Sequence, residues 1–246
     1  MNRGREKEIP ALVAVSKKAG QAIVEYKMIE EGDRIAVAVS GGKDSLSLLH
    51  VLRHRQKISP VKFEFQAVHV DFSFADFDPQ ELMDYLEKEG FPYFVEKVDA
   101  LKDEEWREID CFRWSWNRRK ALFQFCAKQG FNKVAFGHHM DDIAETIILN
   151  QFYRGEISAM KPKQELFDGK ITIIRPLAYV REDAMVCLAR KLGLEGRGQS
   201  KCANDDTSHR ILIKKMLRQF EVHNGNIVKN IFRSLRQENI KQEYLL

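Results

Sequence analysis

Residues 40–45 read Ser-Gly-Gly-Lys-Asp-Ser, a combination of residue types suited to binding phosphate. The two glycines allow backbone N–H groups to turn into one concavity, and the two serines add hydroxyl donors. The lysine supplies a positive charge, while the aspartate can cap a helix or hold Mg²⁺. An ordinary strand-to-helix turn is the alternative, but six polar or glycine residues in this order are far more specific than a Gly-Gly pair. The members of this glycine loop are Ser40, Gly41, Gly42, Lys43, Asp44 and Ser45.

The glycine loop lies between a predicted strand and a predicted helix. Residues 35–39 form an unbroken apolar run, typical of a strand buried on both faces of a parallel sheet. Leucines then recur at helical spacing over residues 46–52, so we expect a helix to begin at about Asp44 or Ser45. The N-terminus of that helix adds a partial positive charge to the loop. The spacing is neither that of a P-loop NTPase nor that of a dinucleotide-binding fold.

A second polar motif, Gly-His-His-Met-Asp-Asp, occupies residues 137–142. It follows a predicted strand at residues 133–136 and opens a predicted helix at residues 141–153. Carboxylates in the first turn of a helix suit its dipole, and Asp141 and Asp142 could also hold Mg²⁺ against a nucleotide. The imidazoles could pair with phosphate or orient a carboxylate. A capped helix with two surface histidines is the alternative that this motif alone would favour.

Strands and helices alternate along most of the chain, which predicts an α/β fold. Strands are expected at residues 35–39, 63–70, 93–98, 133–136 and 171–174. Between them, helices are expected to begin near residues 44, 79, 115 and 141, a further helix spans about residues 10–26, and residues 99–113 form an irregular excursion near the site. This order predicts a doubly wound, parallel five-stranded sheet that binds its ligand at the carboxyl ends of the strands.

The rest of the chain reads as helical and basic, with helices expected at residues 181–192, 207–220 and 226–237. We expect an N-terminal helical segment at 1–30, an α/β domain at 31–180 and a basic helical extension at 181–246. The net charge of the 246 residues is only +4, so binding to a polyanion needs local basic patches. No apolar run approaches membrane-spanning length and the start lacks a signal-peptide core. We therefore expect a cytoplasmic protein without membrane contact.

The glycine loop resembles the SGGxDS pyrophosphate loop of the PP-loop ATP pyrophosphatases, enzymes that cut ATP between its α and β phosphates. Residues 133–181 carry Gly-His-His-Met-Asp-Asp, Leu-Asn-Gln-Phe-Tyr-Arg-Gly, Met-Lys-Pro-Lys and Ile-Ile-Arg-Pro-Leu-Ala-Tyr, and they resemble the tRNA 2-thiocytidine synthetases of that superfamily. The resemblance runs from about residue 10 to 220. It implies an adenine nucleotide α-hydrolase-like fold. It also implies a reaction in which Mg-ATP adenylates the C2 oxygen of an anticodon-loop cytidine and a sulfur nucleophile displaces AMP.

The resemblance further implies roles for single residues. Lys43, Asp141 and Asp142 would be catalytic, neutralising charge on the phosphates, and Asp44 and Asp142 would hold magnesium. The nucleotide would contact Ala38, Ser40, Gly41, Gly42, Lys43, Asp44, Ser45, Val68, His69, Gly137 and His138. RNA would contact Arg113, Trp114, Arg118, Arg119, Lys120, Arg154, Lys161 and Lys163, with the tryptophan offering a stacking surface for a base.

The cysteines depart from the family pattern, in which three of them hold a [4Fe–4S] cluster. One C-x-x-C position reads Cys111-Phe-Arg-Trp114 and the later one reads Gln199-Ser-Lys-Cys202. A cluster normally needs three or four thiolates, so the pattern argues against a standard one. Cys111 and Cys202 could instead pass sulfur as a persulfide, because a helix N-terminus and basic neighbours would lower the pKa of Cys111. A packed thiol is the alternative for Cys111, and we expect Cys126 and Cys187, which align with apolar faces, to pack in the core.

Three functions remain open at this point. The chain could thiolate tRNA, act as a PP-loop ligase or sulfurtransferase on another acceptor, or bind a nucleotide without turnover. Pyrophosphate release would separate the two enzymes from the binding module. For the first function the sulfur would come from a donor protein or from sulfide, and the resemblance implies that the chain can form a homodimer.

Overall fold

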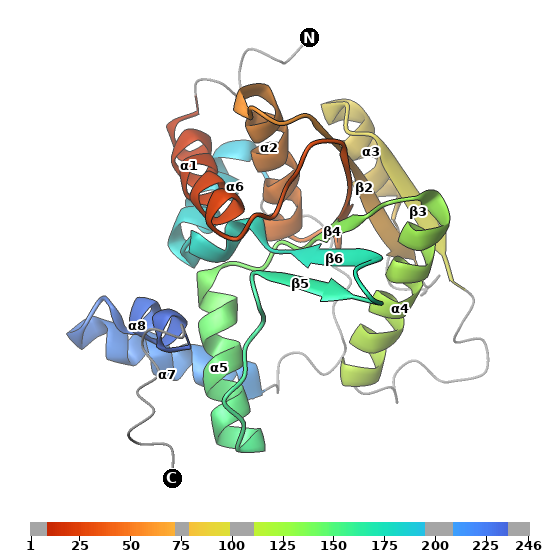
Figure 1. Cartoon of the computed structure of the whole chain (residues 1–246). Helices are drawn as coiled ribbons and strands as arrows, with labels where there is room; N and C mark the ends of the chain where they lie inside the picture. The colour runs from red at the N-terminus through yellow and green to blue at the C-terminus, as the bar shows by residue number, and fades with distance from the viewer. Residues whose placement is uncertain (1–8, 72–78, 99–110, 195–208, 236–246) are drawn as a thin grey trace.

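A computed structural model describes residues 9–71, 79–98, 111–194 and 209–235, with residues 111–115 described by their backbone alone. Six strands form one sheet in the order β3-β2-β1-β4-β6-β5 (Figure 1). They are β1 (Asp33–Ala38), β2 (Phe63–Asp71), β3 (Tyr93–Lys97), β4 (Lys133–Ala135), β5 (Lys163–Leu166) and β6 (Ile171–Ile174). The five predicted strands are present and pair in parallel, which confirms the doubly wound α/β fold.

The sixth strand, β5, is absent from the sequence prediction. It pairs antiparallel with β6 at the edge of the sheet, and the two form a hairpin. Its sequence, Lys-Gln-Glu-Leu, lacks the apolar run that marked the other strands, because an edge strand is covered on fewer sides. The hairpin turn holds Phe167 and Asp168 at φ values of 54° and 56°, followed by Gly169.

Helices cover both faces of the sheet. They are α1 (Pro10–Glu25), α2 (Lys43–Ile58), α3 (Gln80–Glu89), α4 (Cys111–Gln129), α5 (Met140–Arg154), α6 (Glu182–Leu192), α7 (His209–His223) and α8 (Ile227–Ser234), with a 3₁₀ helix at Pro176–Tyr179. The strand side chains alternate between the two faces. In β1, Val37 joins a cluster with residues of α1, α2, α3 and α6, whereas Ala36 joins a cluster with residues of α4.

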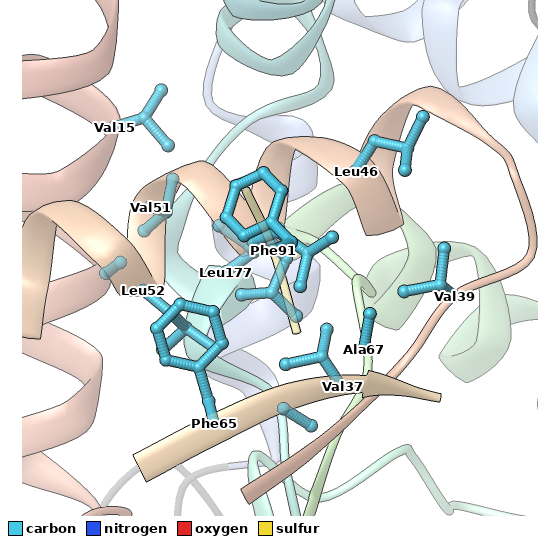
Figure 2. Packing of buried hydrophobic residues seen from close by; sticks show 14 of the residues in the cluster. Val15, Val37, Val39, Leu46, Val51, Leu52, Phe65, Ala67, Phe91 and Leu177 are labelled. Atoms are coloured by element: carbon cyan, nitrogen blue, oxygen red, sulfur yellow. The ribbon is translucent and has the colours of Figure 1, made fainter. Parts of the chain in front are cut away.

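The core beneath α2 holds the glycine loop in place. Leu46 and Leu52 of α2 are fully buried in one cluster with Val37 of β1 and Phe65 of β2 (Figure 2). Val39, the last residue before the glycine loop, is buried in the same cluster, and its N–H donates to Val68 O at 2.9 Å. The loop therefore starts from a strand end that packing and a hydrogen bond both fix.

Two differences from the predicted helices bear on function. α4 begins at Cys111 rather than near Ser115, so residues 111–113 are helical and not part of the expected excursion, whose residues 99–110 lie outside the described residues. The helices of the predicted C-terminal extension also pack against different parts of the fold. α6 packs on α1 and α2, whereas α8 buries Val228 and Phe232 against α5. None of the described helices is long and apolar enough to cross a membrane.

Candidate active site

The two polar motifs lie at the point where the strand order of the sheet reverses. β1 pairs with β2 on one side and with β4 on the other, and the chain leaves β1 and β4 in opposite directions across the sheet. In open α/β sheets such a switch point forms a crevice at the carboxyl ends of the strands, where ligands bind. The glycine loop follows β1, and residues 137–142 follow β4.

The glycine loop is held in shape by its own serines. Ser40 N–H donates to the Ser45 hydroxyl at 3.3 Å, and that hydroxyl donates to Gly42 O at 2.9 Å. Gly41 has a φ of +82°, a conformation that favours glycine. No side chain caps the N-terminus of α2 at Gly42 in this part of the structure. The first N–H groups of a 16-residue helix are thus left for an anion.

Gly137 brings the second motif against the glycine loop. A Cβ atom on Gly137 would lie 3.0 Å from both Asp44 C and Ser45 N and 3.1 Å from Asp44 O. These are backbone atoms of the first turn of α2, so they could yield only by moving the loop. A larger residue here would push the two backbones apart by a few tenths of an ångström.

The charged residues of the glycine loop form a pair. The ammonium of Lys43 lies 2.7 Å from Asp44 Oδ2, and each side chain is 29% exposed. The other carboxylate oxygen, Asp44 Oδ1, is buried and has no hydrogen-bond partner among the described residues. A buried carboxylate oxygen without a donor is free to take a cation.

The two aspartates predicted to act together face different partners. Asp141 accepts from Arg181 Nε at 3.1 Å and from Glu182 N–H at 2.8 Å, so its carboxylate ties α5 to α6. Asp142 accepts from the N–H of His139 at 2.9 Å. Burial raises the pKa of Asp142, but the nearby histidines and Arg210 outweigh burial and lower the pKa overall. Asp142 is therefore the ionised carboxylate of this turn that remains available at the site.

A cavity of about 210 Å³ opens beside the glycine loop. It is lined by Ala38, Val39, Val68, Val70, Arg118, Arg119, Leu122, Phe136, His138 and Arg210. Its floor is the carboxyl end of β1 and β2, and its walls carry three arginines from α4 and α7. Ala38, Val68 and His138, three of the residues predicted to contact the nucleotide, thus line one cavity. A small apolar-floored cavity with a cationic wall suits a base together with a phosphate.

His138 is fixed in one protonation state by Arg175. Arg175 Nε donates to His138 Nδ1 at 3.3 Å, and a guanidinium can only donate, so Nδ1 carries no proton and Nε2 does. Burial lowers the pKa of His138 to about 3, with Arg175 and other cations adding to the effect and Asp142 opposing it. Phe136 stacks on the imidazole at a centroid distance of 5.5 Å. His138 therefore lines the cavity as a neutral ring with one N–H donor.

Sequence reasoning missed Arg175 and Arg210 as site residues. Arg175 follows β6 directly, and its position at the carboxyl end of a strand is a signal that could have identified it. Arg210 comes from α7, where it appeared only as one of many basic residues. Its Nη2 donates to the Thr146 hydroxyl at 2.9 Å and its Nε lies 3.4 Å from Glu145. Burial raises the pKa of Glu145 to about 7, and Arg210 opposes that rise.

The other predicted residues are placed as follows. His69 is buried and its Nδ1 donates to Val39 O at 2.8 Å, so it joins β2 to the end of β1. Arg118 and Arg119, predicted for RNA, line the cavity, whereas Lys120 is exposed beside the Trp116 ring. Lys163 donates to Lys27 O at 2.9 Å, and Arg154 and Lys161 are exposed. Cys111, Arg113 and Trp114 lie in the backbone-only turn of α4, and Cys202 lies outside the described residues.

A family model described as a PP-loop domain matches residues 12–219. The chain belongs to the PP-loop family. Among similar PP-loop proteins is the tRNA-cytidine(32) 2-sulfurtransferase of Geotalea daltonii, 36% identical over 240 residues that cover 94% of this chain and 93% of the relative. The proteins of the same name from Alcanivorax borkumensis and Alkalilimnicola ehrlichii are 38% and 39% identical. The matches cover 89% and 94% of this chain and 79% and 74% of those relatives.

A solved structure shows the same fold. The U34-tRNA thiolase NcsA from Methanococcus maripaludis, described with its [4Fe-4S] cluster, superposes with a TM-score of 0.76 at 21% identity, covering 94% of this chain and 80% of that one. At this identity the likeness establishes the adenine nucleotide α-hydrolase-like arrangement of the sheet, and with it the fold expected from the resemblance.

Proposed function

We propose that this PP-loop protein uses ATP to adenylate the C2 oxygen of cytidine 32 in tRNA and then replaces that oxygen with sulfur. The contact of Gly137 with the first turn of α2 carries the proposal, because it joins the glycine loop and the second motif into one nucleotide site. The substrate is taken from relatives that are 36–39% identical over 89–94% of the chain and are named tRNA-cytidine(32) 2-sulfurtransferases.

The site suits ATP with magnesium. The open N-terminus of α2 and the glycine loop bind the β and γ phosphates, and the cavity next to Val68 takes the adenosine. Asp44 Oδ1, buried without a partner among the described residues, and Asp142 are the oxygen ligands that would hold magnesium. When bound, the ion would neutralise charge on the phosphates. Lys43 supplies a positive charge of the chain's own beside them.

In the first step the C2 oxygen of cytidine attacks the α phosphorus. The bond from that phosphorus to the bridging oxygen breaks, and pyrophosphate leaves with the electron pair. Negative charge grows on the leaving oxygens, and Lys43 stabilises it. His138 donates its Nε2–H to an oxygen of the reacting group, a role that a neutral imidazole fills because Arg175 occupies Nδ1. Asp141 acts at a distance, by holding α6 against the turn that carries Asp142.

In the second step sulfur displaces AMP from C2. A donor protein, or sulfide together with an oxidant, first forms a persulfide on Cys111. The terminal sulfur of this persulfide attacks C2, and AMP leaves with the former C2 oxygen. The Cys202 thiol then attacks the Cys111 sulfur, which releases thiocytidine and leaves a Cys111–Cys202 disulfide for a dithiol reductant. Cys202 enters this scheme from its sequence position alone. A thiol at the first residue of a helix gains thiolate character, and Cys111 holds that position.

The cysteines do not fit a three-thiolate cluster. Cys126 is buried among the apolar residues between α4 and the sheet, where burial raises its pKa to about 12 and disfavours the thiolate. Cys187 is exposed on α6, which packs on α1 and α2, so the prediction that this thiol packs in the core is wrong. Only Cys111 and Cys202 remain of the four cysteines in the chain. No group of three His, Cys, Asp or Glu side chains able to hold a metal occurs among the described residues.

The test is an in vitro reaction with unmodified tRNA, Mg-ATP and a persulfide donor. Pyrophosphate and AMP should appear in equal amounts with 2-thiocytidine, detected by mass spectrometry of the digested tRNA. Anaerobically purified protein should contain no stoichiometric iron. Pyrophosphate formed with another acceptor but not with tRNA would support adenylation and refute tRNA as the substrate. No pyrophosphate with any acceptor would make the chain a binding module.

A further inference from the structure

The C-terminal end of α5 carries large apolar side chains that are exposed in the described structure. Residues 151–157 are all exposed, and among them Phe152 is 63%, Tyr153 44% and Ile157 70% exposed. Figure 1 shows this end of α5 extending beyond the edge of the sheet. Exposed aromatic residues gathered at one place mark an interaction surface more often than scattered ones do.

The exposed end is held in a defined shape. The Tyr153 ring stacks on the His209 ring of α7, with centroids 4.0 Å apart and planes at 28°. The turn after the helix is fixed by Asn150, whose side chain donates to Ser158 O at 3.1 Å and to the Ser158 hydroxyl at 2.9 Å. The Tyr153 and His209 rings are therefore held in place before binding, which reduces the entropy lost on binding.

The N-terminal end of α7, which begins at His209, also lines the nucleotide cavity. Arg210 follows His209 directly and lines the cavity, where it donates to Thr146. Thr146 and Tyr153 are two turns apart on α5, a distance of about 10 Å at 1.5 Å per residue. Stacked nucleotides are spaced by about 3.4 Å along one strand, so this distance corresponds to about three nucleotides.

We propose that Phe152, Tyr153 and His209 form a stacking platform for unpaired RNA bases that flank the nucleotide reacting in the cavity. This inference rests on the proposed function and assigns its RNA-binding surface. The charges favour RNA over a protein partner. Arg154, Lys161 and Lys215 are exposed close by in sequence, and no carboxylate of the described residues pairs with them. Cations for the phosphates interleaved with aromatic rings are the pattern of single-stranded nucleic-acid binding.

The test compares Tyr153→Ala with Tyr153→Trp and with Phe220→Ala. Phe220 is 53% exposed near the other end of α7 and serves as the matched control. The probes are an unmodified anticodon stem-loop transcript and a duplex RNA of equal length. Their binding is measured by fluorescence anisotropy in the presence of a non-hydrolysable ATP analogue. Tyr153→Ala should weaken stem-loop binding by about 10-fold, the effect of losing one base stack, and should leave duplex binding unchanged. Tyr153→Trp and Phe220→Ala should retain stem-loop binding.

The outcomes separate the platform from the proposed function. If the wild-type chain binds neither RNA, the tRNA substrate fails together with the platform. If the wild-type chain binds the stem-loop and Tyr153→Ala binds it equally well, the platform alone is overturned. If RNA binding survives in Tyr153→Ala but thiolation with a sulfur-donor protein is lost, the surface docks a protein. That result would also overturn the platform.

Discussion

Replacing His138 with glutamine should make the protein more resistant to acid, and the size of the effect follows from the pKa of the imidazole. His138 has a folded-state pKa of about 3, against about 6.5 in an unfolded chain. A histidine with a lowered pKa stabilises the fold above pH 6.5, and this stability is lost as the pH falls toward the folded-state value, because only the unfolded chain takes up the proton. Between pH 7 and pH 5 the loss is about 2 kcal/mol.

The loss of about 2 kcal/mol does not depend on the exact folded-state pKa, since any pKa well below 5 gives the same loss at pH 5. It is an upper value, because the ring keeps some exposure to the cavity. Glutamine is the chosen replacement because its amide oxygen can accept from Arg175 while its N–H₂ group keeps a donor. The substitution therefore removes the titration and keeps the hydrogen bond.

The wild-type curve alone is not diagnostic, because Glu145 acts with the opposite sign. Its pKa of about 7 lies above the unfolded value, so its contribution to stability is present at low pH and lost as the pH rises. The measurement is therefore the difference in free energy of unfolding between His138→Gln and wild type, from urea titrations at pH 7 and pH 5. We expect this difference to move by about 2 kcal/mol in favour of the variant. A difference that stays constant with pH would show that folded His138 takes up protons normally, which refutes the neutral donor.

Three further substitutions test the site. Gly137→Ala places a methyl group 3.0 Å from the backbone of Asp44 and Ser45, so it should cost about 1–3 kcal/mol of overpacking and raise the KM for ATP, and an unchanged KM would contradict the contact. Lys43→Ala should lower pyrophosphate release by about 100-fold or more while circular dichroism and the urea midpoint stay near wild type. Cys111→Ser should leave pyrophosphate release intact and abolish 2-thiocytidine, and continued thiolation would remove Cys111 from the sulfur step.

The fold was predictable from the sequence where burial on both faces of the sheet imposes an apolar run. Residues 35–39 have such a run, and β1 is indeed one of the two central strands. β5 was not predictable because a polar edge strand depends on its partner β6 for pairing rather than on its own side chains. The start of α4 was missed for a related reason, since its first turn carries no apolar periodicity.

The site was predictable as far as it lies in contiguous motifs. The glycine loop and residues 137–142 follow neighbouring strands, so the sheet rule alone brings them together. The separation of Asp141 from Asp142 was not predictable, because it depends on Arg181, 40 residues along the chain. The cationic wall of the cavity was equally hidden, since Arg118 and Arg210 come together through two separate contacts, the packing of α4 on β2 and β3 and the packing of α7 on α5.

The charge arrangement of the cavity explains why a histidine there should be neutral. Three arginines line the cavity and Arg175 donates to the ring, so a proton on Nδ1 would place one more positive charge against a guanidinium. An anion entering the cavity meets enough fixed positive charge already. What it lacks is a directed donor, and a neutral imidazole held by Arg175 and Phe136 supplies one without the repulsion. On this argument Arg175→Met should lower the kcat of adenylation more than it raises the KM for ATP. If kcat is unchanged and only the KM for ATP rises, Arg175 serves binding instead.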